Sequence, residues 1–152
     1  MTPEETKKRA LRLLEKRDYS RGELIAKLME KGAEENDAIA VVDRLVELRF
    51  INDESYAAMI VRHYAAKGFG AARIREELRR RRIPREMWDA ALSDLPDSGE
   101  TVYALLTAKL RSDAPDRDEL RRASDALRRR GFTWEQVRGA IERFNTERNS
   151  DT

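Results

Sequence analysis

The chain has 152 residues, of which 40% are hydrophobic and 39% charged, and its formal net charge is +2 at pH 7. The charged share lies well above the roughly one quarter typical of globular domains, which favours small helical modules with thin cores over one large core. The absence of cysteine and the presence of a single histidine, His63, exclude disulfides, thiol nucleophiles and zinc sites built from several such residues. No apolar run is long enough to cross a bilayer and no signal-peptide pattern opens the chain, so we expect a cytoplasmic protein.

Apolar residues recur at helical spacing along almost the whole chain, and helix-start signals precede the apolar clusters. Four pairs have the spacing of a capping box, in which a side-chain oxygen accepts the hydrogen bond of a free amide: Thr2 with Glu5, Ser20 with Glu23, Asp116 with Glu119, and Thr133 with Gln136. Pro84 suits the first turn of a helix, where its missing N–H needs no partner. Every predicted element is therefore a helix.

Three similar segments follow one another along the chain. Leu28, Leu78 and Leu127 lie 50 and 49 residues apart, each in the second helix of a predicted unit. The sequence thus predicts an all-α fold, an elongated array of three tandem three-helix repeats that resemble helix-turn-helix bundles. The predicted repeats cover residues 1–50, 51–96 and 97–147, and residues 148–152 are expected to form a disordered tail.

Charge is segregated along the chain in spite of the small net value. Residues 34–54 hold seven acidic side chains against two arginines, whereas residues 62–86 hold nine basic side chains against three acidic ones. Each charge by itself is typical of a solvated helix face. The separation of sign, however, indicates an oriented surface potential that can dock a charged partner.

Basic side chains on two predicted helices are the candidates for partner binding. Arginine offers forked contacts to carboxylate or phosphate, which favours recognition over solvation alone. The candidates are Lys67, Arg73, Arg75, Arg79, Arg80, Arg82, Arg121, Arg122, Arg128 and Arg129. Arg128 and Arg129, together with the adjacent Arg130, leave an alternative open, because cations are also favoured by the macrodipole at a helix C-terminus.

A second set of residues is interpreted as structural. It comprises Phe50, Ile51, Asn52, Asp53, Tyr56, Gly68, Gly70, Ile74 and Leu78. Phe50, Ile51 and Tyr56, together with Ile60, form an apolar set across a helix start, interpreted as a hydrophobic staple and module junction, with a partner hot spot as the alternative. Asn52 and Asp53 are expected to be helix caps and not catalytic acids. Trp134 is expected to pack under its own helix, Trp88 to be core and His63 to be partly exposed.

One stretch of the chain resembles the core signature of the RecX family. It runs Leu48-Arg49-Phe50-Ile51-Asn52-Asp53, then Tyr56-Ala57, Arg62, Lys67-Gly68-Phe69-Gly70, Arg73-Ile74, Glu77-Leu78 and Ile83. The opening Arg9-Ala10-Leu11 and Arg17-Asp18-Tyr19-Ser20 also match, so that the resemblance covers roughly residues 8 to 144. At Arg82 the family usually has glycine, and we expect this position to tolerate a helical residue.

The resemblance implies a cytoplasmic, non-enzymatic regulator of bacterial DNA repair, homologous recombination and the SOS response. Proteins of this family bind filaments of the RecA recombinase on single-stranded DNA. They typically oppose filament extension, ATP hydrolysis, strand exchange and co-protease activity. The expected partner is the groove of the RecA filament, with weak contact to single- or double-stranded DNA as an auxiliary. A monomer is expected, with no cofactor, metal or membrane partner.

A direct DNA-binding helical module is the main alternative function, and a passive helical scaffold is a third, which only the family resemblance disfavours. Three-helix units resemble helix-turn-helix folds, and the helix predicted over residues 70–82 is rich in arginine. Against this alternative, the net charge is small, and Glu76 and Glu77 interrupt the basic helix.

Overall fold

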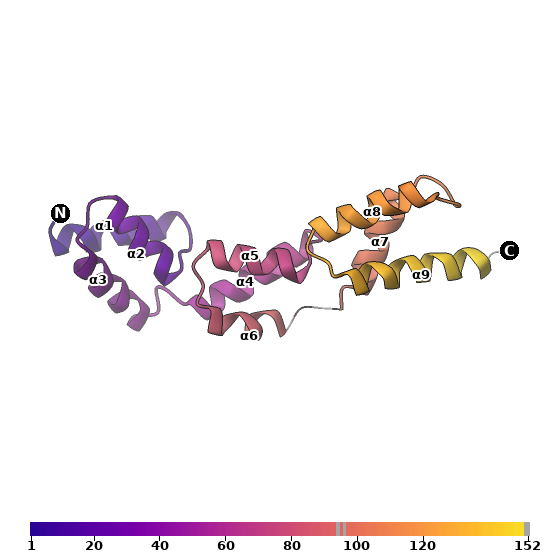
Figure 1. Ribbon diagram of the computed structural model, residues 1–152. Coiled ribbons are helices and arrows are strands. Elements are labelled where there is room, and N and C mark those ends of the chain that lie inside the picture. Colours follow the sequence, from indigo (N-terminus) through magenta and orange to yellow (C-terminus); the bar gives the residue numbers. More distant parts are fainter. Residues whose placement is uncertain (94, 96, 151–152) are drawn as a thin grey trace. The chain divides into compact units, whose positions relative to one another are not determined.

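The fold is all-α, as the sequence predicts. The computed structural model describes residues 1–93, 95 and 97–150, and this part of the chain contains helices and connecting turns but no strand (Figure 1). The elements are α1 (Pro3–Lys16), α2 (Arg21–Glu30), α3 (Glu35–Glu47), α4 (Asp53–Ala66), α5 (Ala71–Arg80), the short 3-10 helix η1 (Arg85–Met87), α6 (Trp88–Ser93), α7 (Gly99–Lys109), α8 (Arg117–Arg129) and α9 (Trp134–Ser150). The predicted boundary between the second and third repeats falls on Pro96, which lies outside the described residues.

Side-chain caps begin several of these helices. The capping boxes predicted at Thr2, Ser20 and Thr133 are confirmed, with both hydrogen bonds of each box formed. At the start of α8, Asp116 accepts the amide of Glu119, but the Glu119 carboxylate accepts the amide of Arg111 and so leaves the box half complete. Local sequence therefore fixes where these helices begin.

The turns that end five helices share one geometry. In each, a residue with positive φ follows the helix, and the next residue's amide reaches back to the carbonyl five positions earlier, which is the Schellman arrangement. The positive-φ residues are Gly32, Arg49, Gly68, Arg82 and Gly131. Each turn satisfies carbonyls that the helix end would otherwise leave free.

The expectation of a helical residue at Arg82 is wrong. Its φ is +56°, in the left-handed region where a side chain clashes with the following carbonyl oxygen. The turn imposes this conformation because the amide of Ile83 donates to Leu78 O at 3.0 Å. Arg82 thus stands where glycine would be less strained.

The expected disordered tail is replaced by helix as far as Ser150, since residues 148–150 belong to α9. Arg143 binds Glu147 one turn further along α9, at 3.0 Å. The hydroxyl of Tyr103 on α7 also donates to Glu147, and these two bonds lower the pKa of that carboxyl. Contacts between α7 and α9, which the helical pattern alone does not reveal, therefore support the last turns. Residues 151–152 lie outside the described part.

The chain divides into two spatial units. The first contains Met1–Ile60 and Glu77–Ala91, and the second contains Val61–Glu76 and the residues from Leu92 onward. In the first unit α1, α2 and α3 pack around a core that includes Leu24, Leu28 and Val42. The division between the units crosses α4 and α5, so the limits of three repeats stay a prediction.

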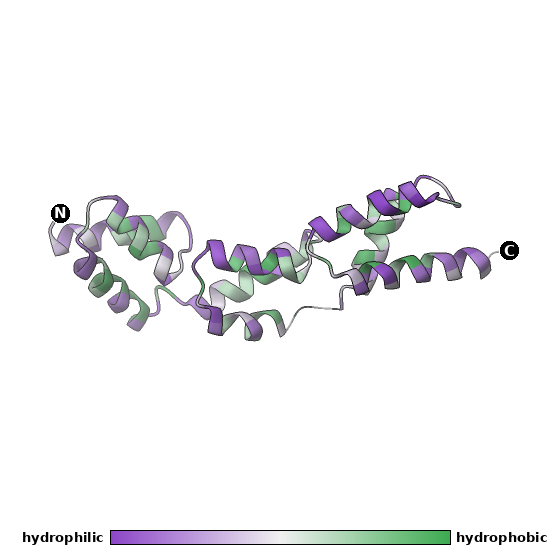
Figure 2. Ribbon diagram, viewed as in Figure 1, coloured by the Kyte–Doolittle hydropathy of each residue, from purple (hydrophilic) through white to green (hydrophobic). Residues whose placement is uncertain are grey.

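The core of the second unit lies among α7, α8 and α9. These helices pack around a cluster that includes Val102, Leu106, Leu127, Phe132 and Val137. Hydrophilic residues cover most of α8 (Figure 2), so only a narrow stripe of this helix contributes to the core.

Replacing Arg82 by glycine should stabilise the protein. The left-handed backbone costs a residue with a side chain about 1–2 kcal/mol, of which the greater chain entropy of glycine offsets a part. We expect Arg82→Gly to raise the free energy of unfolding in urea by about 1 kcal/mol. Arg79→Gly, one turn earlier inside α5, should lower it by about 1 kcal/mol. A loss of stability in both variants would contradict the assigned turn.

Candidate partner-binding surface

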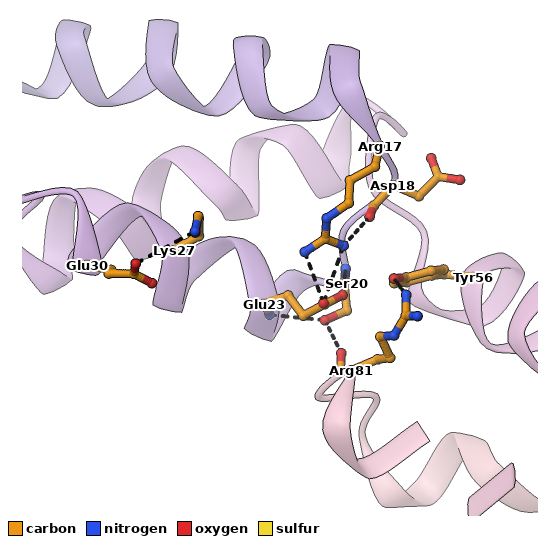
Figure 3. A network of polar contacts seen from close by, with 8 residues as sticks. All are labelled: Arg17, Asp18, Ser20, Glu23, Lys27, Glu30, Tyr56 and Arg81. Atoms are coloured by element: carbon orange, nitrogen blue, oxygen red, sulfur yellow. Dashed lines mark hydrogen bonds and ion pairs between the residues drawn. The ribbon is translucent and has the colours of Figure 1, made fainter. Parts of the chain in front are cut away.

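A helix start meets a helix end inside the first unit. The hydroxyl of Ser20, at the start of α2, donates to the carbonyl of Arg81, just beyond α5, at 2.5 Å (Figure 3). A Cβ on Gly22 would lie 2.9 Å from Cβ of Arg82, so glycine permits this close approach. Ser20 and Arg81 thus join the two helix ends directly.

Polar side chains surround this contact. Arg81 Nη1 donates to the hydroxyl of Tyr56 at 2.7 Å, and burial raises the pKa of that hydroxyl, which keeps it protonated (Figure 3). Arg17 lies 3.6 Å from the ring centroid of Tyr19 and binds Glu23 at 3.3 Å. On either side of the Ser20–Arg81 bond, these contacts join the end of α5 to α4 and the end of α1 to the start of α2.

Asp53 caps a helix other than its own. Its carboxylate accepts the amide of Arg21 at 2.8 Å, at the start of α2, whereas Asn52 caps α4 through the amide of Ser55. Burial raises the pKa of the Asp53 carboxyl, although the hydrogen bond from Arg21 opposes this shift. Arg21 also binds Asp43 at 2.7 Å, and that bond raises the pKa of the guanidinium. Asp53 therefore joins two segments of the first unit.

The second unit contains a corresponding junction. The amide of Gly70, which precedes α5, donates to Arg130 O at 2.8 Å, and the amide of Ala72 donates to Gly131 O at 3.3 Å. A Cβ on Gly70 would lie 2.4 Å from the carbonyl carbon of Gly131. Free amides at the start of α5 are thus satisfied by free carbonyls at the end of α8.

Basic and aromatic side chains gather at this second junction. The guanidinium groups of Arg73 and Arg130 lie 5.6 and 5.4 Å from the ring centroid of Phe69. Arg130 also donates to the carbonyls of Lys67 and Gly68, at 3.2 and 3.4 Å. Two of the predicted cations, Lys67 and Arg73, are thereby brought next to the end of α8, where Arg128 and Arg129 are exposed. We call Lys67, Arg73, Arg128, Arg129 and Arg130 the basic cluster.

The other cations on α5 differ in their surroundings. Arg80 is exposed and pairs with the buried Glu77 at 3.3 Å. Arg75 and Arg79 are exposed and also make interactions within the chain. Arg82 is exposed in its left-handed turn. Intramolecular contacts therefore engage much of the helix that the sequence indicates as the main binding surface.

Exposed arginines on α8 are less engaged. Arg121 pairs with Asp118 at 3.4 Å. Arg122, Arg128 and Arg129 are exposed, and their guanidinium groups form no hydrogen bond or ion pair with any other described residue. The end of α8 therefore presents the guanidinium groups that an external partner can reach most readily.

The structural set is mostly placed as the sequence predicts. Ile51, Tyr56, Gly68, Gly70, Ile74 and Leu78 are buried. Phe50 is exposed, so its interpretation as part of a buried staple is wrong: its own turn carries the ring outward. Trp134 is also exposed at the start of α9, where its position in the first turn places it beyond the core. Trp88 is half-buried and donates to Ile83 O at 2.9 Å, and His63 is exposed as expected.

The ten cations predicted from the sequence include neither Arg130, which the sequence only groups with Arg128 and Arg129 at a helix end, nor the contacting ring of Phe69. Arg130 continues the run of Arg128 and Arg129 but directly precedes the positive-φ Gly131, a position that turns its side chain toward Phe69. This adjacency to glycine was the available signal. Among the described residues, no group of three or more acidic, histidine or cysteine side chains could hold a metal. None of the described helices has the length and apolar character needed to cross a bilayer.

Fold and surface together define a class, an all-helical protein of short helices whose cations gather where one helix end meets another helix start. Family models for the first and second three-helix domains of RecX match residues 7–45 and 52–92. The "Regulatory protein RecX" of Xanthomonas axonopodis pv. citri is 38% identical over 141 residues, 91% of this chain and 86% of that protein. The protein of the same name from Chromohalobacter salexigens is 36% identical over 135 residues, 87% of this chain and 88% of that protein. The chain belongs to the RecX family.

Solved structures agree with the fold. The crystal structure of RecX from Lactobacillus salivarius has a TM-score of 0.86 at 21% identity, covering 95% of this chain and 97% of that one. Another crystal structure of a regulatory protein RecX has a TM-score of 0.81 at 22% identity, covering 92% of this chain and 71% of that one. Three-helix organisation is thus shared with proteins of low sequence identity.

Two separate glycine-to-alanine variants test the second junction. Gly70→Ala would place a Cβ against the backbone of Gly131, and we expect a loss of about 1–3 kcal/mol in unfolding free energy. Gly139→Ala, in α9 with nothing within 4 Å of the added Cβ, should gain about 0.5–1 kcal/mol. Urea unfolding followed by circular dichroism measures both changes. A change of the same sign in the unfolding free energy of both variants would rule out the close contact at Gly70.

Proposed function

We propose that this protein regulates the RecA recombinase by binding its filament on single-stranded DNA, and that it acts as an inhibitor without catalysis of its own. Membership of a family whose relatives are named regulatory proteins is the observation that carries the proposal. The binding residues we propose are the ten predicted cations, with Arg130 in a supporting role. By this action the protein limits filament extension, ATP hydrolysis, strand exchange and co-protease activity in DNA repair and the SOS response.

The end of α8 is the part of this surface with the most accessible charge. Arg128 and Arg129 are exposed and are held beside Lys67 and Arg73 by the junction that Arg130 completes. Guanidinium groups bind carboxylates through paired hydrogen bonds, so acidic residues of a RecA protomer are suitable counterparts. The junction supports recognition because it positions cations from α5 and α8 together before a partner arrives.

Bridging is the mechanism we favour. A protein with basic side chains on both of its units can contact more than one RecA protomer. Contacts to neighbouring protomers would oppose the rearrangements that ATP turnover and strand exchange require. A protein that bridges protomers would inhibit at amounts well below one molecule per RecA protomer. A protein that only competes with RecA for DNA would need larger amounts. We expect the protein to work as a monomer in the filament groove.

Direct binding to DNA is the second candidate. Arg122, Arg128 and Arg129, which have no ion pair among the described residues, could also neutralise backbone phosphates. Binding of that kind weakens steeply as salt rises, with a slope set by the number of phosphates neutralised. Inhibition that disappears when free DNA is added would favour this candidate.

The test is ATP hydrolysis by RecA on single-stranded DNA, titrated with this protein. We expect inhibition at well below one molecule per RecA protomer, persisting when free DNA is in excess. Reversing charge in Arg128→Glu/Arg129→Glu should raise the amount needed for half inhibition at least about tenfold, since buried or closely paired interface charges typically cost 2 kcal/mol or more when disrupted.

A matched control is available on α1. Arg12→Glu/Lys16→Glu makes the same change in charge, also near a helix end, at exposed residues outside the predicted surface. This variant should inhibit as the unmodified protein does. Both variants should retain their helical circular dichroism, with a loss of about 0.3–1 kcal/mol for each charge placed against the macrodipole. Equal inhibition by both variants would remove the end of α8 from the binding surface.

A further inference from the structure

The turn after α3 differs from the four other Schellman turns. In such a turn the second residue beyond the helix cap usually packs back against the helix. Ala33, Ile83 and Phe132 occupy this position in their turns and are buried, and Phe69 is half-buried. Phe50 occupies it after α3, and 60% of its surface is exposed. The backbone hydrogen bonds of this turn match those of the other four, so only the side chain of Phe50 departs from the pattern.

Phe50 does not stand alone. Leu48 is 47% exposed and Val46 is 38% exposed, so three large apolar side chains face solvent within five residues. We call residues 46–50 the α3 edge. Single exposed apolar residues are ordinary, whereas a group that includes an aromatic ring is typical of a contact surface.

Hollows lie on either side of the α3 edge, both within the first unit. Leu48 lines one of them together with Pro3 and Val41. Val46 and Arg49 line the other, together with Ile51 and Met87 as well as charged residues at its rim. Apolar side chains of a partner could therefore be accommodated on both sides of the turn.

Arg49 supplies a charge between the exposed apolar side chains. It is exposed and has a φ of +65°. Its backbone amide donates to Val46 O at 3.0 Å, but its guanidinium forms no hydrogen bond or ion pair with any other residue that the structure describes. The nearby Glu47 is bound by Arg44 at 2.9 Å and does not neutralise Arg49. A carboxylate is the complement of this guanidinium.

The charge around the edge favours a protein over a nucleic acid. Residues 34–54, which include α3, hold seven acidic side chains against two arginines. A polyanion approaching this segment would be repelled at many phosphates, whereas a segment with one carboxylate between apolar side chains bears much less repulsion, which its ion pair with Arg49 offsets.

We propose that the α3 edge is a second contact surface, which binds a protein segment presenting a carboxylate between apolar side chains. This inference rests on the proposed function, in which the segment belongs to a RecA protomer. In the complex, Phe50 and Leu48 become buried against the apolar side chains of the segment, and Arg49 fixes its register through an ion pair with its carboxylate. The surface lies in the first unit and is separate from the basic cluster, which belongs to the second.

The test measures binding of the full-length protein to RecA filaments on single-stranded DNA, together with thermal unfolding. Leu48→Ser/Phe50→Ser should weaken binding about tenfold or more, because truncating an interface anchor has effects of this size. Its melting temperature should stay unchanged or rise, since both side chains already face solvent. Met29→Ser, at an apolar residue on α2 that is 41% exposed, is the matched control and should bind normally.

Arg49→Gly separates a binding role from a structural one. Glycine relieves the positive φ, so the melting temperature should rise, while loss of the guanidinium should weaken binding several-fold. A merely structural residue would not give a more stable protein that binds less well. Suppose that the unmodified protein binds filaments and that both variants, Leu48→Ser/Phe50→Ser and Arg49→Gly, bind as tightly as it does. In that case the α3 edge is not a contact surface, and this inference is overturned while the proposed function stands. If the unmodified protein binds no filament, the proposed function fails and this inference with it.

Discussion

The constraint on which this structure depends is the satisfaction of backbone groups at helix ends. Each helix leaves about four amides and four carbonyls without a partner in its own ladder. A chain with many short helices and thin cores has many such ends and little apolar burial to offset unsatisfied ones. Side chains such as Ser20 cap the starts, and Schellman turns close the ends. At the two junctions, the end of one helix accepts hydrogen bonds from the start of another.

The same constraint explains where the cations lie. Carbonyls at a helix end carry partial negative charge, which favours arginine nearby. At the end of α8 this preference accounts for a run of arginines, of which Arg130 is used within the protein and Arg128 and Arg129 remain exposed. Structural and binding interpretations of these residues are therefore compatible. The macrodipole favours the charges, and the junction with Gly70 determines which of them face solvent.

Features that depend on local sequence could be predicted, whereas features set by distant contacts could not. The caps at Thr2 and Thr133 involve residues three positions apart, so spacing alone identifies them. The left-handed conformation of Arg82 does not follow from its residue type, because arginine ordinarily continues a helix; only the glycine usual at this position in the family indicates the turn. The inward position of Arg130 depends on Phe69, which lies about 60 residues away in sequence and 5.4 Å away in space. The exposure of Phe50 could not be predicted, because an apolar side chain is equally compatible with a core residue and with a residue that contacts a partner.

Two kinds of surface then follow from one architecture. The basic cluster is assembled by a junction between the start of α5 and the end of α8, where Arg130 and Arg73 lie against Phe69 while Arg128 and Arg129 stay exposed. The α3 edge is formed by one turn and presents apolar side chains with a single guanidinium at Arg49. Charged contacts mainly direct encounter and register, whereas buried apolar anchors mainly slow dissociation. Under the proposed function, a regulator that must find a filament and then remain on it needs both properties. Placing them in separate units lets each be changed without disturbing the packing of the other.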